Sequence, residues 1–79
     1  MYYIYILRSV VYPNRTYTGY TNNLKQRLAD HNCGQSIHTS KLGPWQLETY
    51  FVFSEESKAI AFEKYLKSGS GRAFAKKHF

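Results

Sequence analysis

A chain of 79 residues with a net charge of +6 has room for one small domain, which buries roughly 60% of the surface of the unfolded chain. Its single cysteine, Cys33, excludes an intramolecular disulfide and is typical of a reducing compartment, so we expect a cytoplasmic protein. The longest apolar stretch, Tyr2 to Leu7, is too short to span a membrane or to form the core of a signal peptide. The positive charge suggests a polyanionic partner, although many basic proteins bind none.

The first part of the chain predicts two strands joined by a turn. Tyr2 to Ser9 has apolar side chains on both faces, which indicates a central strand that is covered on both sides. Pro13 marks the turn, and Thr16 to Tyr20 returns as the second strand of an antiparallel hairpin. Tyr5 and Tyr17 then share a face of the sheet, unless a bulge changes the register.

A helix is predicted next, from about Asn22 to Asn32, because asparagines at its start are good N-caps. Leu24 and Leu28 lie four residues apart and therefore share one face of this helix. Arg27 and His31 have the same spacing and project from a neighbouring stripe.

A polar connection that contains His38 and Lys41 leads to a third predicted strand, Trp45 to Phe53. Ser54 is expected to cap a second helix. The apolar stripe of that helix consists of Ala59, Phe62 and Leu66. Ser68 to Gly71 is expected to end it, and a short third helix is predicted from about Arg72.

The residues with chemical potential each allow two interpretations. Arg27 and His31 are either a solvated helix face, with Arg27 paired to Asp30, or a phosphate clamp. In the second case the planar guanidinium binds phosphate oxygens, and His31 orients a water molecule or assists proton transfer. Both interpretations remain open from the residues alone.

Glu63 is the only acidic residue from Ala59 onward, among five lysines and arginines. It either pairs with Lys67 one helical turn later, or is a lone carboxylate ligand for Mg²⁺, which often binds one or two carboxylates and a substrate phosphate. Tyr5 and Tyr17 either fill the core or act as a base. The second role needs a positive charge that lowers a tyrosine pKa from about 10.

The basic end of the chain is either a solubilising surface or a set of salt-sensitive contacts to a nucleic-acid backbone. Its cationic residues are Lys64, Lys67, Arg72, Lys76 and Lys77.

The order of these short motifs resembles the GIY-YIG nuclease family, and more narrowly its small stand-alone bacterial proteins. The motifs are Tyr3-Ile4-Tyr5, Tyr17-Thr18-Gly19, Arg27 with His31, and Glu63. The closing stretch from Tyr65 to Arg72 is also similar to that subgroup, and the resemblance extends from Tyr2 to about Lys77.

The resemblance implies an α+β fold in which helices flank a three-stranded antiparallel sheet, with residues 1–79 as a single domain. It also implies a DNA endonuclease that depends on one Mg²⁺ or Mn²⁺ ion and acts in DNA repair or nucleic-acid processing. The implied catalytic residues are Tyr5, Tyr17, Arg27, His31 and Glu63. In that role Tyr5 helps to deprotonate the attacking water, and Arg27 and His31 act at the scissile phosphate. Glu63 holds the metal.

The resemblance further implies a DNA partner, structured or single-stranded, and a monomer or weak dimer. His38, Lys41 and the basic residues of the chain's end are the expected nucleic-acid contacts. Many family nucleases also carry an asparagine in the helix after the metal-binding glutamate, whereas the last asparagine here is Asn32. The alternative function is a catalytically weak module that binds nucleic acid through its basic end.

Overall fold

Three antiparallel strands form one sheet in the computed structural model, which describes residues 1–33 and 40–79. The strands are β1 (Tyr2–Ser9), β2 (Thr16–Thr21) and β3 (Trp45–Phe53), arranged in the order β2-β1-β3. The bounds of β1 and β3 agree with the prediction, and β2 is one residue longer than expected. Together with the flanking helices, this sheet confirms the predicted α+β fold.

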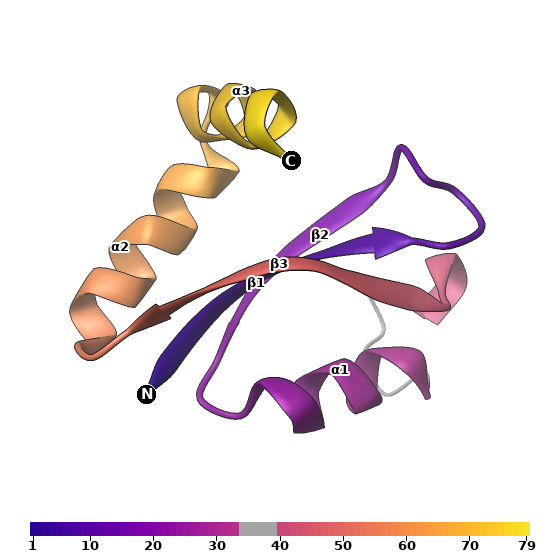
Figure 1. The fold of residues 1–79 in the computed structure, drawn as a ribbon, viewed down its shortest axis with the longest axis horizontal. Helices are drawn as coiled ribbons and strands as arrows, with labels where there is room; N and C mark the ends of the chain where they lie inside the picture. The colour runs from indigo at the N-terminus through magenta and orange to yellow at the C-terminus, as the bar shows by residue number, and fades with distance from the viewer. Residues whose placement is uncertain (34–39) are drawn as a thin grey trace.

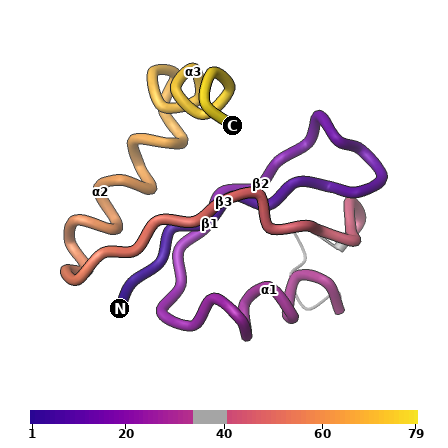
Figure 2. Tube along the Cα trace, in the orientation of Figure 1, coloured from indigo at the N-terminus to yellow at the C-terminus, as the bar shows by residue number. Residues whose placement is uncertain are grey.

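The register of the sheet places β1 between two partners and makes β2 an edge strand. Tyr5 lies opposite Gly19 of β2 on one side and Tyr50 of β3 on the other. The turn that joins β1 to β2 is closed by a hydrogen bond from the Arg15 amide to the Tyr12 carbonyl, at 2.8 Å. Figure 2 shows this connection extending beyond the sheet, away from α2 (Glu56–Lys67).

The helices lie on opposite faces of the sheet (Figure 1). α1 (Leu24–Asn32) lies on one face, and α2 and α3 (Gly69–His78) lie on the other. α1 begins two residues later than predicted, because the Asn23 side chain accepts a hydrogen bond from the Gln26 amide and so caps the helix. A single 3-10 turn, η1 (Ser40–Leu42), precedes β3. In the described part of the chain, no helix combines the length and the apolar character needed to cross a membrane.

Two predicted helix ends are wrong. Glu55 rather than Ser54 is the N-cap of α2, and its side chain makes no capping hydrogen bond. Between α2 and α3 the chain is interrupted at Ser68 alone, and α3 then begins at Gly69 rather than near Arg72. The reason is that the Ser68 hydroxyl accepts a hydrogen bond from the Gly71 amide, so the same serine ends one helix and caps the next.

Gly71 allows α3 to begin so soon after α2. A Cβ atom at this position would lie 1.7 Å from the Tyr65 carbonyl oxygen and 2.5 Å from Leu66 Cα. Both contacts are with backbone, which cannot move aside as a flexible side chain would. Gly69 differs, because a Cβ atom there would meet nothing within 4 Å.

Each face of the sheet has its own buried cluster. On the side of α2 and α3, the buried residues are Ile4, Ile6, Ala59 and Leu66, and the aromatic rings of both helices and of β3 pack around them. On the side of α1, they are Tyr5, Leu7 and Trp45, with Tyr17, Leu24 and Leu28 packed against them. The alternation of β1 therefore supplies two different cores, as its apolar residues on both faces predicted.

Candidate active site

Tyr5, Tyr17 and His31 converge on the α1 side of the sheet. The Tyr5 hydroxyl lies 2.9 Å from His31 Nε2, and both residues are 2% exposed. The Tyr17 ring lies 5.0 Å from the His31 ring and 6.4 Å from the Tyr5 ring, measured between centroids. The prediction that Tyr5 and Tyr17 share a face is therefore confirmed, and their shared partner is the histidine of α1.

Gly19 makes the space in which the Tyr5 ring lies. A Cβ atom on Gly19 would lie 2.3 Å from the Tyr5 hydroxyl oxygen and 2.5 Å from Cζ of the same ring. A buried phenol ring cannot give way to such an atom without moving the cluster. Gly19 of the Tyr17-Thr18-Gly19 motif thus allows the tyrosine of β1 to reach across β2 at the edge of the sheet.

Burial shifts the two titrating groups of the hydrogen bond in opposite directions. Burial, with smaller effects of the neighbouring Tyr17 and Glu63, raises the pKa of Tyr5 and outweighs the opposing charge of Arg27. Burial also lowers the pKa of His31, and the positive charge of Arg27 adds to this effect. At neutral pH the pair is therefore a phenol and a neutral imidazole, and in the tautomer protonated on Nδ1 the Tyr5 hydroxyl donates to His31 Nε2.

Arg27 alone does not give Tyr5 the lowered pKa that a tyrosine base needs. Its positive charge is near enough to act on Tyr5. The pKa of Tyr5 is nevertheless raised, because desolvation of a buried phenolate raises it more than the positive charge of Arg27 lowers it. In this structure Tyr5 is a hydrogen-bonded phenol.

Arg27 is exposed on α1, one helical turn before His31. Asp30, its suggested ion-pair partner, accepts a hydrogen bond from Gln26 Nε2 at 2.9 Å instead. The guanidinium acts on both Tyr5 and His31 through its charge. Arg27 thus adds a positive charge to the surface side of the buried cluster.

Glu63 approaches the same region from the other face of the sheet. Its side chain is 22% exposed, and its charge adds a small part to the rise of the Tyr5 pKa that burial causes. The Lys67 ammonium donates to its carboxylate at 3.3 Å, so the ion pair suggested by the sequence is present. Glu63 is linked to the cluster by charge, and its direct contact is Lys67.

The donor set around Glu63 fits a hydrated Mg²⁺ ion but not a metal site made of protein ligands alone. Among residues 1–33 and 40–79, no group of three or more histidines, cysteines, aspartates or glutamates is arranged to hold a metal. Mg²⁺ needs no such group, because it retains waters and binds one or two carboxylates with a substrate phosphate. A partly exposed carboxylate whose other contact is a surface lysine meets this requirement.

Asn32, directly after His31, joins α1 to the start of β3. Its Nδ2 atom donates to the Trp45 carbonyl at 3.0 Å, and its Oδ1 atom accepts from the Trp45 amide at 2.6 Å. The side chain therefore hydrogen-bonds both backbone groups of one strand residue, a contact that was not predicted from the sequence. It fixes the end of α1 on which His31 lies.

The remaining predicted residues do not all lie together. His38 is outside the described residues, and Lys41 is exposed in η1. The five basic residues of α2 and α3 that were predicted to contact nucleic acid are all exposed, and Lys67, Arg72 and Lys76 line one groove. Arg8 and Arg15 line that groove too. Neither was predicted from the sequence, because both come from the distant β1–β2 hairpin.

The family profile of the GIY-YIG catalytic domain matches residues 1–77, and the three-stranded α+β fold is consistent with such a domain. The chain therefore belongs to the GIY-YIG nuclease family.

Its relatives include small bacterial proteins and one larger nuclease subunit. A UPF0213 protein of Streptococcus pyogenes serotype M3 is 38% identical over 72 residues, which cover 90% of this chain and 76% of that protein. A UPF0213 protein of Pediococcus acidilactici is 39% identical over 72 residues, which cover 87% and 71%. The structure-specific endonuclease subunit SLX1 homolog of Giardia intestinalis is 35% identical over 65 residues, which cover 77% of this chain and 18% of that protein.

Proposed function

We propose that residues 1–79 form a single-domain endonuclease that hydrolyses phosphodiester bonds in DNA with one Mg²⁺ or Mn²⁺ ion. Membership of the family and similarity to a structure-specific endonuclease subunit support this class of reaction. The observation that carries the proposal is the buried Tyr5–His31 hydrogen bond, which is subject to the opposite charges of Arg27 and Glu63. We place the protein in the cytoplasm, in DNA repair or nucleic-acid processing.

Tyr5 and His31 act together as the base in the proposed reaction. As the attacking water approaches phosphorus, its proton passes to the Tyr5 oxygen while the Tyr5 proton passes to His31 Nε2. The water oxygen forms a bond to phosphorus, the bond from phosphorus to the leaving oxygen breaks, and solvent protonates that oxygen. Because the imidazole is neutral near pH 7, it can accept the proton that a buried phenol alone would retain.

Arg27 binds the scissile phosphate in this proposal. Its exposed guanidinium presents a planar set of donors that matches two phosphate oxygens, and it lies one turn from His31 on α1. Charge that develops on the phosphate during attack strengthens this contact. Tyr17 packs on the His31 ring and holds it toward Tyr5.

Glu63 would hold the divalent ion. When bound, the ion supplies Lewis-acid stabilisation of charge on the phosphate and on the leaving oxygen. The carboxylate must then exchange its contact with Lys67, which is readily lost because exposed ion pairs contribute little.

The proposal is tested by incubating labelled single-stranded, duplex and branched DNA with the protein in Mg²⁺, Mn²⁺ or EDTA. We expect cleavage that requires the metal and that is lost in Arg27→Ala and in Glu63→Gln. Lys58→Ala is the matched control, because it removes a charge from an exposed pair with Glu55 away from the site. If the wild-type protein binds DNA but cleaves it no faster than Arg27→Ala and Glu63→Gln, the nuclease proposal is wrong.

The second candidate function is a catalytically weak module that binds nucleic acid. The groove shared by Lys67, Arg72 and Lys76 favours it, since a cluster of cations suits a phosphate backbone whether or not cleavage follows. We propose a monomer or weak dimer as the active state in either case. The cleavage assay separates the two functions.

A further inference from the structure

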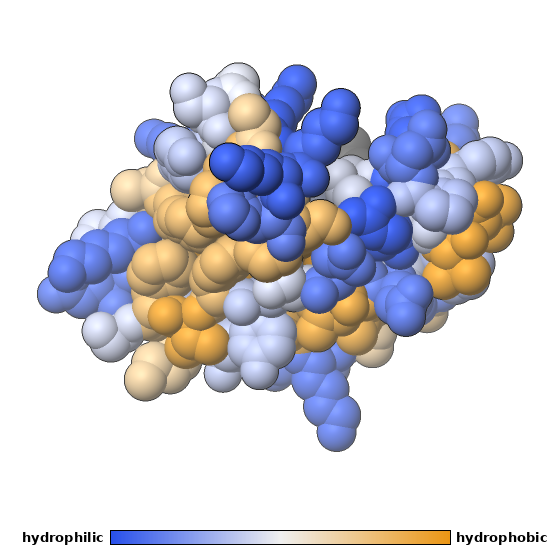
Figure 3. Space-filling model, turned by 45° about the horizontal axis from the view of Figure 1, so that its top comes forward, coloured by the Kyte–Doolittle hydropathy of each residue, from blue (hydrophilic) through white to orange (hydrophobic). Residues whose placement is uncertain are grey.

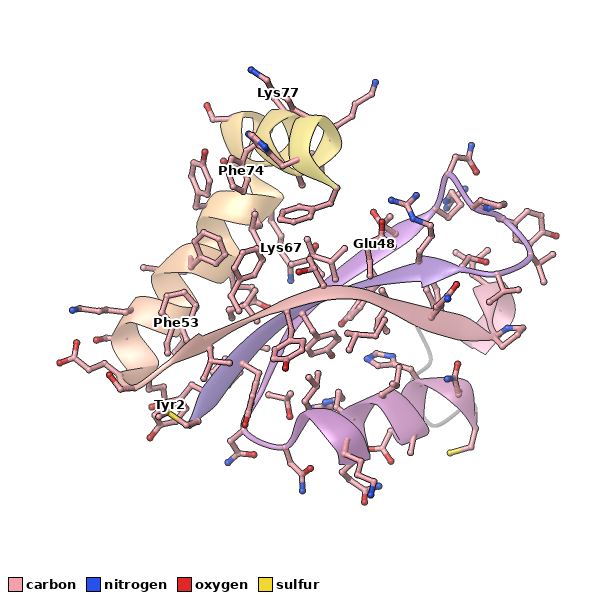
Figure 4. The ribbon with its side chains drawn as sticks, viewed as in Figure 1. Tyr2, Glu48, Phe53, Lys67, Phe74 and Lys77 are labelled. Carbon is pink, nitrogen blue, oxygen red and sulfur yellow. The ribbon has the colours of Figure 1, made fainter. Side chains whose placement is uncertain are left out.

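A groove of about 880 Å³ lies between the β1–β2 hairpin and the helices α2 and α3. Five cationic residues line it: Arg8, Arg15, Lys67, Arg72 and Lys76. Figure 4 shows Lys67 extending from α2 toward the strands, whereas Lys77 extends from α3 away from them. Figure 3, which brings the α3 side of the molecule forward, shows hydrophilic side chains gathered at the top and right of this face, beside a hydrophobic area at its left.

The charged side chains that line the groove are all cationic. None of the described residues that line it is acidic. Arg8 is the cation with a structural role, since it pairs with Glu48 at 3.2 Å and donates to the carbonyls of Pro13 and Phe79. It thereby ties the hairpin, β3 and the end of the chain together. Arg15 on one wall, and Arg72 and Lys76 on the other, remain as the cations most suited to a ligand.

The lining of the groove is also partly apolar. Ile6, Leu66 and Phe79 line it beside the cations; Ile6 and Leu66 are buried, whereas Phe79 is 39% exposed. Proteins that follow a nucleic-acid strand combine cations for its phosphates with apolar and aromatic surface for its bases. A free inorganic anion would use the cations but leave the apolar lining without a partner.

The groove leads to the candidate active site at two points. Tyr17 lines the groove, and its ring also packs on His31. Lys67 lines the groove, and its ammonium contacts the Glu63 carboxylate. A strand lying in the groove would therefore pass along β2, the edge strand, beside residues that belong to or contact the candidate active site.

We propose that this groove binds the backbone of the nucleic-acid strand that flanks the scissile phosphate, through Arg15, Arg72 and Lys76. The proposal rests on the proposed function, because it names the surface that holds the substrate of that site. It divides the basic residues predicted from the sequence into a group that lines the groove and others, such as Lys77, that point elsewhere. It also adds Arg15 from the hairpin.

The test is equilibrium binding, measured by fluorescence anisotropy with a labelled oligonucleotide in EDTA so that no cleavage occurs. The oligonucleotide is used as a single strand and as a duplex, and the two arms show whether the bound strand is paired. Arg72→Ala/Lys76→Ala removes two cations from one wall, and Arg15→Ala removes one from the other. The control Lys25→Ala/Lys58→Ala removes two exposed cations outside the groove.

We expect the double groove variant to bind at least tenfold more weakly, and the control to remain within about twofold of wild type. The slope of log K against log salt should decrease by about 1.4 with a single strand, or about 1.8 with a duplex, because two phosphate contacts are lost. Arg15→Ala should produce about half of this change in slope. Circular dichroism checks that each variant is folded.

Three outcomes contradict the proposal that the groove binds nucleic acid. They are no binding by the wild-type protein, equal weakening of binding in the groove and control variants, and unchanged binding in both Arg15→Ala and the double groove variant. Cleavage by the wild-type protein can persist in the last two cases, so the proposed function survives them. Conversely, if the wild-type protein binds nucleic acid through the groove but never cleaves it, the proposed nuclease function is wrong and the proposed binding surface stands.

Discussion

The two faces of the sheet differ in what they bury, although β1 contributes to both. Toward α2 and α3, Ile4 and Ile6 meet apolar and aromatic side chains, and the rings of Phe51 and Phe62 lie 4.8 Å apart. Toward α1, Tyr5 lies in a cluster with His31 and Tyr17. β1 thus contributes to an apolar core on one face and to the Tyr5–His31 cluster on the other, so substitutions in the two clusters should have different consequences.

The largest expected effect is on the α1 face. Tyr5→Phe keeps the ring but removes the hydroxyl that bonds to His31, so cleavage should fall by about 10²- to 10⁴-fold. The free energy of unfolding should fall by only about 1 kcal/mol, as for a single hydrogen bond. Cleavage rates and urea denaturation measure the two effects. Wild-type cleavage by Tyr5→Phe would remove Tyr5 from the proposed base.

Phe62→Ala tests the opposite face. The half-buried ring packs against Phe51 and Phe53, so its loss should lower the free energy of unfolding by about 3 kcal/mol. The fraction that remains folded should cleave at the wild-type rate. Ile60→Ala, at an exposed position of the same helix, is the control. A large loss of cleavage per folded molecule would show that the two faces are not independent.

Two glycines of the α2–α3 junction provide a smaller and sharper contrast. Gly71→Ala puts a methyl group against the backbone of Tyr65 and Leu66, and should lower the free energy of unfolding by about 2 kcal/mol. Gly69→Ala meets no atom within 4 Å and should be neutral or slightly stabilising. Thermal unfolding of the two variants side by side tests this. Equal stability would mean that α3 can shift on α2 at little cost.

The smallest expected effect is the pH dependence that comes from His31. Because burial lowers the pKa of His31 in the folded state, the unfolded chain takes up a proton first as the pH falls below about 6.5. This contribution to stability is therefore present above that pH and is lost as the pH falls toward the folded pKa. His31→Gln should show a weaker decrease between about pH 7.5 and 5.5 in urea denaturation. An identical pH dependence in both proteins would argue against a buried neutral His31.

The sequence predicted much of the fold because the strands have strong local signals. Tyr2–Ser9 and Trp45–Phe53 were assigned with the correct bounds, and the shared face of Tyr5 and Tyr17 followed from the hairpin. The helix junction was predicted less well. Two glycines indicated a long interruption, whereas the capping of α3 by Ser68 reduces it to one residue.

The electrostatics of the site could not be predicted in the same way. A nearby arginine suggested a lowered tyrosine pKa, but the sign depends on how deeply Tyr5 is buried, which only the packed structure defines. The groove was likewise hidden, because Arg15 and Arg72 are far apart in the sequence and meet only after the hairpin and α3 are in place.

The contact between Asn32 and Trp45 has a consequence for how much the rest of the chain can vary. The asparagine side chain substitutes for a neighbouring strand, so the end of α1 and the start of β3 are joined independently of the residues between them. Because this contact holds the two ends of the connection together, we expect connections of different length or composition to be accepted there. The Asn32–Trp45 contact thereby helps to hold His31, the residue before Asn32, in its position against the sheet.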